Sequence, residues 1–309
     1  MNRLALVTGA AGFIGRHVCQ ILHGQGYRVV GIGYGDWPAE ERRVWGVDAW
    51  RNQKISIEVL ESMTKAEGEP EILIHCAGGS SVGISLEHPR RDFEQTVVTT
   101  ADVLEFARRR EGRLTVVYPS SAAVYGVVDG RPISENAPLL PASPYGVHKR
   151  MAEELCQVYA MNWKVPLAIV RLFSVYGPGL RKQLLWDACI KAQAGNFSFS
   201  GSGDEVRDWI HVSDAAVLLV LAAEKATPVC PVVNGGTGAG LTVKDVLCCL
   251  GRLWTPALTP NFSGKVRHGD PPCYVADVSS MHTWGCRPEA DIGNALADYI
   301  RWFKSERGV

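Results

Sequence analysis

The sequence contains no extended block of like charge, no long apolar run and no C-x-x-C pair. Its 32 basic and 32 acidic side chains give a formal net charge of zero, which does not fit a surface for nucleic acid. No apolar run is long enough to span a bilayer, and the chain goes straight into a predicted strand without a signal peptide. The histidines show no metal-ligand spacing. We therefore expect no nucleic acid, no membrane and no metal among its partners.

Cysteine is present, but not in a pattern that suits disulfides. The nine cysteines are odd in number and scattered, and the adjacent Cys248 and Cys249 cannot form an ordinary bridge with each other. We expect free thiols in a reducing compartment and therefore a cytoplasmic protein. The 309 residues, 46% of them apolar and 21% charged, suffice for one large domain or two modest ones.

The first informative segment is a short apolar run with a glycine-rich turn directly behind it. Residues 4–7 predict a buried parallel strand, residues 12–25 a helix and residues 28–32 a second strand. The turn before the helix carries three glycines: Gly9, Gly12 and Gly15. They permit a tight turn, close approach of a pyrophosphate and close packing of the helix on the strand. This βαβ unit predicts dinucleotide binding.

Two further predicted strands end in small residues. Residues 71–76 are followed by Ala77 and Gly78, and residues 114–118 are followed by a segment that includes Ser121. Open α/β sheets bind ligands at the carboxyl ends of their parallel strands. We expect both segments to border the same site.

Tyr145 and Lys149 stand four residues apart at the start of a predicted helix, so they share one helix face. A free phenol titrates near pH ~10, and a nearby ammonium group favours the phenolate. The pair can therefore make a base, although a surface tyrosine beside a solvated lysine is the alternative. A right-handed crossover places Ser121 at the same sheet edge, beside the glycine turn. We expect His148 to point away from the tyrosine face.

Together these motifs resemble the extended short-chain dehydrogenase/reductase family. The glycines are spaced G-x-x-G-x-x-G with Phe13 and Ile14 inside the turn, and residues 143–149 read S-P-Y-G-V-H-K. The resemblance covers nearly the whole chain.

The resemblance implies an α/β fold of two parts. A Rossmann-type doubly wound parallel sheet is expected over residues 1–173, with returns near residues 208–236. A smaller C-terminal α/β lobe over residues 174–309 would bind most of the nucleotide sugar.

The cofactor implied is NAD. The residues implied to bind it are Gly9, Gly12, Phe13, Ile14, Gly15, Ala77, Gly78, Tyr145 and Lys149. NAD-binding members usually carry an acidic residue where this chain has Gly33, and Arg42 and Arg43 lie downstream. NADP is therefore the alternative cofactor.

The resemblance also implies a Ser-Tyr-Lys catalytic set. Tyr145 would be the general acid/base, and Lys149 would lower the pKa of Tyr145 and hold the cofactor ribose. Ser121 would hydrogen-bond the reacting oxygen, with Ser120 as its competitor for that role.

The reaction implied is epimerisation at C4 of a UDP-sugar. Members that dehydrate or decarboxylate place acids directly after the serine, whereas this chain has Ala122 and Ala123. The segment resembles the 4-epimerases, which oxidise C4, turn the 4-keto sugar over and reduce its other face.

The substrate residues implied by the resemblance are Ser81, Ser121, Ser174, Arg207, Arg267, Asp270 and Tyr274. The two arginines would grip the diphosphate, because planar, permanently charged donors suit phosphate oxygens. The alternative for Arg207 is an ion pair with Asp208 or Asp214. A large side chain such as Tyr274 usually accompanies glucose and galactose. The small loop at residues 79–82 favours UDP-GlcNAc and UDP-GalNAc, and we lean to that pair.

Two other functions remain open from the sequence. An NADP-dependent nucleotide-4-ketosugar reductase would agree with Gly33. A non-catalytic dinucleotide-binding protein would not need the serine, tyrosine and lysine. Two predicted helices, residues 91–110 and 145–161, resemble the pair that forms a homodimer interface in this family.

Overall fold

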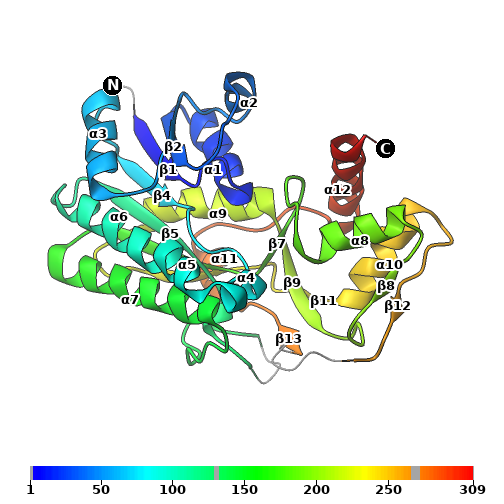
Figure 1. The fold of residues 1–309 in the computed structure, drawn as a ribbon. Coiled ribbons are helices and arrows are strands. Elements are labelled where there is room, and N and C mark those ends of the chain that lie inside the picture. The colour runs from blue at the N-terminus through cyan, green and yellow to red at the C-terminus, as the bar shows by residue number, and fades with distance from the viewer. Residues whose placement is uncertain (1–2, 129–131, 266–271, 309) are drawn as a thin grey trace.

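A computed structural model describes residues 3–128, 132–265 and 272–308. Its main element is a seven-stranded sheet with the order β10-β6-β5-β4-β1-β2-β3, parallel throughout (Figure 1). Its strands, in chain order, are β1 (Leu4–Thr8), β2 (Arg28–Gly33), β3 (Ala49–Asn52), β4 (Ile72–His75), β5 (Thr115–Ser121), β6 (Leu167–Leu172) and β10 (Val232–Gly235). The strand order reverses between β1 and β4, which is where doubly wound sheets bind ligands.

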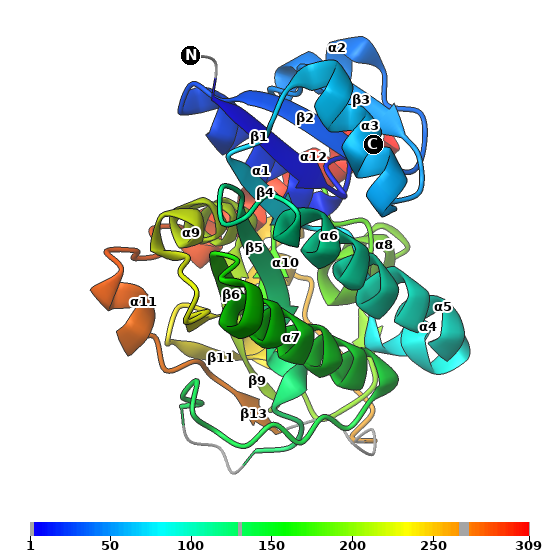
Figure 2. The same cartoon turned by 90° about the vertical axis from the view of Figure 1, so that its left-hand side faces the viewer.

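Helices cover both faces of this sheet (Figure 2). One apolar core lies under α1 (Phe13–Gly24) and α9 (Val212–Lys225), which pack on each other. The core on the opposite face lies under α3 (Ile57–Glu67), α6 (Thr99–Arg108) and α7 (Pro144–Trp163). The strands between them are buried on both sides, so they read in the sequence as continuous apolar runs rather than alternating ones.

The helix predicted over residues 91–110 is divided in the structure. It is preceded by α4 (Val82–Glu87) and consists of α5 (Pro89–Phe93), a π-helical turn η1 (Glu94–Val98) and α6. The Thr99 hydroxyl donates a hydrogen bond to the Gln95 carbonyl, and the Thr100 hydroxyl donates one to the Thr96 carbonyl. These hydroxyl groups compete with backbone amide groups for the carbonyl acceptors of the turn. The short α2 (Ala39–Val44) connects β2 to β3.

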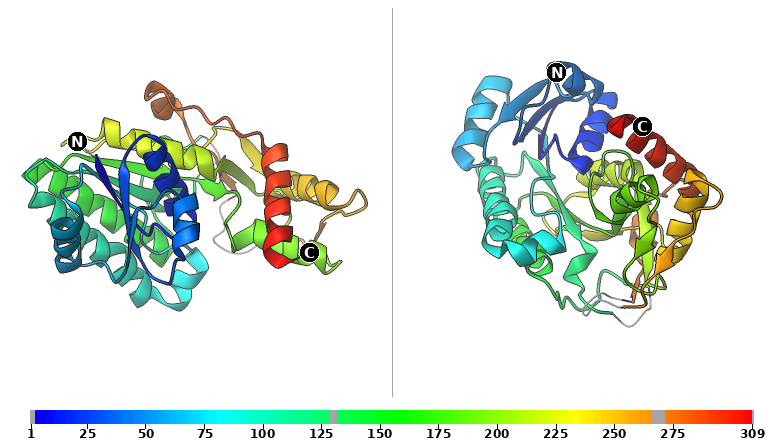
Figure 3. Two further views of the ribbon diagram at one scale, coloured as in Figure 1. Left: turned by 90° about the horizontal axis from the view of Figure 1, so that it is seen from above. Right: turned by 45° about the vertical axis from the view of Figure 1, so that its right-hand side comes forward.

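A second lobe stands beside the carboxyl edge of the large sheet (Figure 3). Its sheet contains β7 (Ser174–Tyr176), β9 (Val206–His211), β11 (Gly240–Thr242) and β13 (Cys273–Tyr274), and β8 (Ser198–Phe199) pairs with β12 (Asn261–Phe262). Its core is formed mainly by α8 (Gln183–Gln193), α10 (Val243–Trp254) and α12 (Ile292–Arg307). The short α11 (Ser279–Thr283) packs on β10 of the large sheet. The predicted lobe boundary at residue 173 stays a prediction.

The predicted elements of the first half agree with the structure within a few residues. Thr242 caps α10, its hydroxyl accepting from the Asp245 amide at 3.0 Å. All nine cysteines are free thiols. In the ranges that the structure describes, the helices are too short or too polar to cross a membrane. The predicted cytoplasmic location stays a prediction.

Candidate active site

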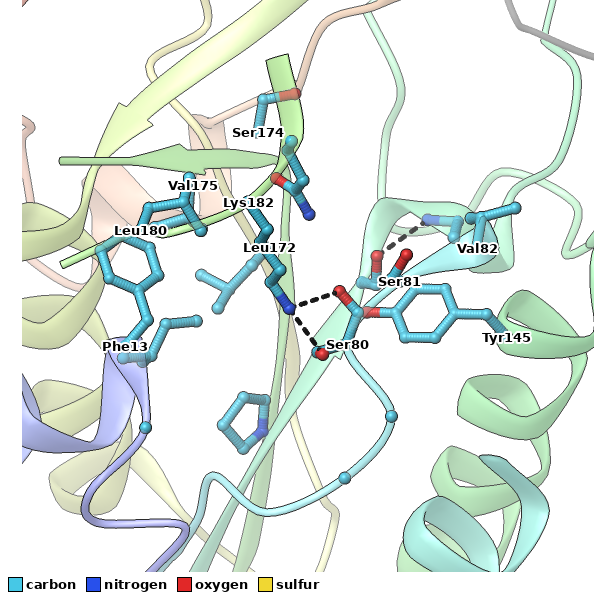
Figure 4. A pocket seen from close by; sticks show the side chains of 18 of the residues that line it. Phe13, Ser80, Ser81, Val82, Tyr145, Leu172, Ser174, Val175, Leu180 and Lys182 are labelled. Atoms are coloured by element: carbon cyan, nitrogen blue, oxygen red, sulfur yellow. Dashed lines mark hydrogen bonds between the residues drawn. The ribbon is translucent and has the colours of Figure 1, made fainter. Parts of the chain in front are cut away.

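A pocket of about 1260 Å³ lies between the two lobes, at the carboxyl edge of the large sheet (Figure 4). The glycine turn, the loop after β4 and the end of β5 line it on one side. The start of α8, β7 and β9 line it on the other. Single-ligand pockets usually occupy ~300–1,000 Å³, so this one has room for a dinucleotide and a second ligand together.

The glycine turn has the shape of a pyrophosphate cradle. Gly9 adopts φ 65°, and a Cβ on Gly15 would lie only 2.2 Å from the Gly9 carbonyl oxygen. Gly12 caps α1 without a side chain, so the first amide groups of that helix are left for a ligand. The five predicted residues of the turn all line the pocket: Gly9, Gly12, Phe13, Ile14 and Gly15. These residues fit the pyrophosphate of NAD.

β2 ends in Gly33 and not in the acidic residue that is usual for NAD-binding members, and a neighbouring side chain gives a physical reason. A Cβ on Gly33 would lie 2.9 Å from Cη2 of the Trp50 indole, which comes from the neighbouring strand β3. The Trp50 ring also lines the pocket. The space of the usual acidic side chain is therefore filled by an aromatic ring.

The three predicted catalytic residues meet at one wall of the pocket. Ser121 is the last residue of β5, and Tyr145 and Lys149 lie one turn apart at the start of α7. The Ser121 hydroxyl accepts from the Ala123 amide at 3.2 Å and lies near enough to the Tyr145 phenol to favour its ionised form. Lys149 Nζ donates to the Pro119 carbonyl at 2.9 Å and lies 6.0 Å from the centre of the Tyr145 ring.

Burial shifts the titration of both Tyr145 and Lys149. It raises the pKa of Tyr145, and the nearby Ser121 hydroxyl only partly opposes this effect. Burial also lowers the pKa of Lys149 to about 8, because a buried ammonium group loses its hydration. The predicted lowering of the Tyr145 pKa by Lys149 stays a prediction, because the effects found on this pKa come from burial, the Ser121 hydroxyl and the Asp92 charge.

Ser120 remains near the site but makes no such contact. Its hydroxyl is buried and, within the described part of the chain, has no hydrogen-bond partner. The Ser121 hydroxyl favours ionisation of the Tyr145 phenol, which supports Ser121 over its competitor Ser120 for the predicted role.

The predicted substrate residues lie in three different places. Ser81, Ser174 and Arg207 line the pocket together with Ser121. Tyr274 pairs with Arg207 across β13 and β9, donates to the Gly126 carbonyl and packs edge-on against Phe173 at 6.3 Å. The remaining two, Arg267 and Asp270, lie outside the described residues.

The acidic residues beside Arg207 have other tasks. Asp208 is fully buried, and its carboxylate accepts from the amide groups of Thr237, Gly238 and Ala276. Asp214 accepts from the Ala290 amide at 3.2 Å. Both carboxylates therefore brace loops of the second lobe.

Residues 5–234 match the model of the "NAD dependent epimerase/dehydratase family". The chain belongs to this family. It is 30% identical to "Uncharacterized UDP-glucose epimerase YtcB" of Bacillus subtilis, with 97% of this chain and 98% of that protein covered. It is 28% identical to the UDP-glucose 4-epimerase of the same organism, with 97% and 96% covered.

Two solved structures of this family share the whole fold. UDP-glucose 4-epimerase of Thermotoga maritima, solved with UDP-glucose, matches with a TM-score of 0.88 at 26% identity and covers 98% of this chain and 99% of that one. UDP-glucuronic acid 4-epimerase of Bacillus cereus, solved with UDP-glucuronic acid and NAD, matches with 0.87 at 27% identity and the same coverage. The predicted family, fold class and NAD cofactor are confirmed.

Several residues that line the pocket of this epimerase/dehydratase family member could not be identified from the sequence. Lys182 is the residue before α8, and its Nζ donates to the Ser80 hydroxyl at 2.6 Å and to the Ser80 carbonyl at 3.2 Å (Figure 4). Burial lowers the pKa of Lys182, and within the described ranges no carboxylate lies at ion-pair distance from it. No local pattern around Lys182 indicates that it crosses the pocket. Four others also line it: Trp50, Ile55, Gln183 and Trp209.

Two histidines near the site, His75 and His211, have structural partners. His75 is buried between the hydroxyl groups of Thr8, at 2.7 Å from Nδ1, and Thr100, at 3.2 Å from Nε2. Burial lowers its pKa to about 3, so it is neutral. His211 lies 2.7 Å from the Ser213 hydroxyl. Within the described ranges, no cluster of potential ligands could hold a metal ion.

Proposed function

We propose that the protein interconverts the two C4 epimers of a UDP-sugar. The observation that carries this is the convergence of Ser121, Tyr145 and Lys149 on one wall of the pocket, with Tyr145 and Lys149 one turn apart on α7. Ala122 and Ala123 follow directly, and they bring no acid that could remove or add a second proton. Elimination of water needs such an acid, whereas transfer of one proton and one hydride does not.

Tyr145 takes the proton from the sugar 4-hydroxyl in one direction and returns it in the other. Ser121, on the same pocket wall as the phenol, donates to the oxygen at C4 as that oxygen becomes a carbonyl. Bound NAD supplies the hydride acceptor beside C4 and later the hydride itself. Lys149 is placed to hold the cofactor ribose, and Arg207 to hold the diphosphate while the 4-keto sugar turns over.

Among UDP-sugars we propose an N-acetylhexosamine, because the loop after β4 carries only small side chains toward the pocket. Gly79, Ser80 and Ser81 all line it. A specific observation favours a second candidate, a UDP-hexuronic acid. Lys182 Nζ reaches that same loop at Ser80, and a carboxylate on the sugar would give this cation the partner that the described residues do not provide.

The test is incubation of the purified protein with one UDP-sugar at a time and no added cofactor. An epimerase regenerates its NAD, so UDP-GlcNAc is expected to yield UDP-GalNAc, whereas a reductase would consume a cofactor that is absent. Turnover of UDP-glucuronate instead, lost in Lys182→Met, would select the second candidate. No turnover of any UDP-hexose by a protein that retains its NAD would contradict the proposed function.

Replacement of Ser121 by alanine should move the pH profile of the reaction. The hydroxyl favours the Tyr145 phenolate, so its removal raises the pKa of Tyr145 further. A base with a higher pKa is less deprotonated at a given pH, so the acid-side limb of kcat should shift to higher pH. We expect kcat near neutral pH to fall about 10²-fold. Ser120→Ala is the matched control, and equal effects in the two variants would refute the assignment.

We also propose a homodimer through α7. Apart from Trp163 at its end, this helix exposes four large apolar side chains: Val147, Met151, Val158 and Met161. Their spacing places them on one face, and Val98 of η1 is also exposed. We expect Met151→Glu to convert the dimer to a monomer in analytical ultracentrifugation. Val217→Glu, on α9 and 46% exposed in the wild type, should leave the dimer intact. A monomeric wild type would contradict this interface.

A further inference from the structure

A carboxylate on α5 and an imidazole on the catalytic helix α7 are in contact, and the proposed mechanism uses neither of them. Asp92, on α5, is 3% exposed, and its Oδ2 lies 2.6 Å from Nδ1 of His148. His148 is on α7, between Tyr145 and Lys149 in the sequence, and the Phe93 ring packs edge-on against it at 5.5 Å. A carboxylate only accepts, so Nδ1 carries the proton of this bond. The imidazole points toward α5.

The other oxygen of Asp92 packs against the loop that lines the pocket. A Cβ on Gly79 would lie 1.9 Å from Asp92 Oδ1, so this loop passes directly over the carboxylate. The Gly79 amide donates to the Thr96 hydroxyl at 2.9 Å. One residue therefore touches both the catalytic helix and the loop after β4.

A second contact joins the same two parts. The Tyr145 amide, in the first turn of α7, donates to the Ser85 hydroxyl of α4 at 3.0 Å. The Ser85 hydroxyl in turn donates to the Val82 carbonyl at 2.7 Å. The segment from α4 to α5 thus holds the start of α7 at two points, Tyr145 and His148.

The charge of Asp92 also reaches the two catalytic groups. It raises the pKa of Tyr145 in addition to the larger effect of burial. It favours the charged form of Lys149, against burial, as do Cys76, Glu153 and Cys156. Removal of the Asp92 charge alone should therefore ease ionisation of the phenol.

We propose that Asp92 and His148 are positioning residues of the reaction: their hydrogen bond fixes Tyr145 against the loop at residues 77–81, and the Asp92 carboxylate sets the charge beside it. The proposal rests on the proposed role of Tyr145 as the acid/base. Asp92 and His148 are 56 positions apart in the sequence, so it is the fold of this chain that brings them together.

Asp92→Asn removes the charge of the side chain and keeps its shape, so it tests the role of the charge alone. Asparagine keeps an oxygen that can accept from His148 but carries no charge, so KM should be unchanged and the acid-side limb of kcat should move to lower pH. A profile that superimposes on that of the wild type would overturn the role of the charge.

His148→Ala and His148→Asn test the hydrogen bond. Asparagine places a donor where Nδ1 lies, whereas alanine leaves the buried carboxylate without its partner. We expect kcat of the alanine variant to fall about tenfold at unchanged KM, and the asparagine variant to recover most of it. Equal loss in both variants, or loss confined to thermal stability, would overturn the role of the bond.

Ultraviolet titration of the phenol groups gives a readout that needs no substrate. The difference between Asp92→Asn and Asp92→Asn/Tyr145→Phe isolates the Tyr145 phenol among the nine tyrosines. A titration of Tyr145 at lower pH than in the wild type would support the charge effect even if no UDP-sugar were turned over. An unchanged titration would overturn it, while turnover in the wild type would leave the proposed function intact.

Discussion

Tyr145→Phe is expected to lower kcat about 10³-fold, because a positioned acid/base contributes ~10²–10⁴ to the rate. The phenol lies at the pocket wall, the Ser121 hydroxyl favours its ionised form, and Lys149 Nζ lies 6.0 Å from the centre of its ring. Phenylalanine keeps the ring and removes only the hydroxyl. The measurement is the rate of epimer formation from the UDP-sugar identified above, followed by chromatography of the nucleotide sugars.

Two measurements separate lost chemistry from lost structure in this variant. NAD content per chain and the unfolding temperature should match those of the wild type, because the hydroxyl lies at the pocket and not in the core. A variant that retained a tenth or more of the wild-type kcat would show that another group transfers the proton.

Arg171→Met is expected to destabilise the fold by about 3–5 kcal/mol, because it leaves one charge of a buried pair without its partner. Arg171 on β6 is 3% exposed and donates to Glu153 on α7 through Nε, at 3.0 Å, and Nη2, at 2.7 Å. Its Nη1 also donates to the Tyr125 hydroxyl at 3.0 Å. Urea unfolding of the variant and the wild type measures the difference in free energy.

The control for the Arg171→Met prediction removes both charges of the buried ion pair. Glu153→Leu/Arg171→Met has no isolated carboxylate, so it should recover part of the lost stability. A double variant less stable than Arg171→Met would indicate that Glu153 contributes through other contacts.

The first half of the fold could be predicted because its signals are local. The turn at Gly9, the apolar strands and the Tyr145–Lys149 spacing each lie within a few residues, and each constrains the backbone or one helix face directly. β3 was missed because it is an edge strand of four residues with no alternation, and only pairing with β2 makes it a strand. The division of residues 91–110 depends on threonine hydroxyl groups that a helical pattern does not reveal.

Parts of the site depend on residues that are far apart in the chain. Lys182 meets Ser80 across 102 positions, and Asp92 meets His148 across 56. The effect of burial on the pKa of Tyr145 could not be read from the sequence for a related reason. Helical spacing gives the distance to Lys149, but burial of the phenol, which has the larger effect, is set by everything that packs around it.

The Trp50 indole gives the chain a constraint on its evolution. The Cβ of an acidic residue at position 33, the usual partner of the NAD ribose, would lie 2.9 Å from the far end of the indole, so the ring must shift or be replaced to admit it. A smaller residue at position 50 would make that space, but by itself it leaves a hole beside β2. Descendants of this chain are therefore expected to keep glycine and tryptophan at these positions together or to lose them together.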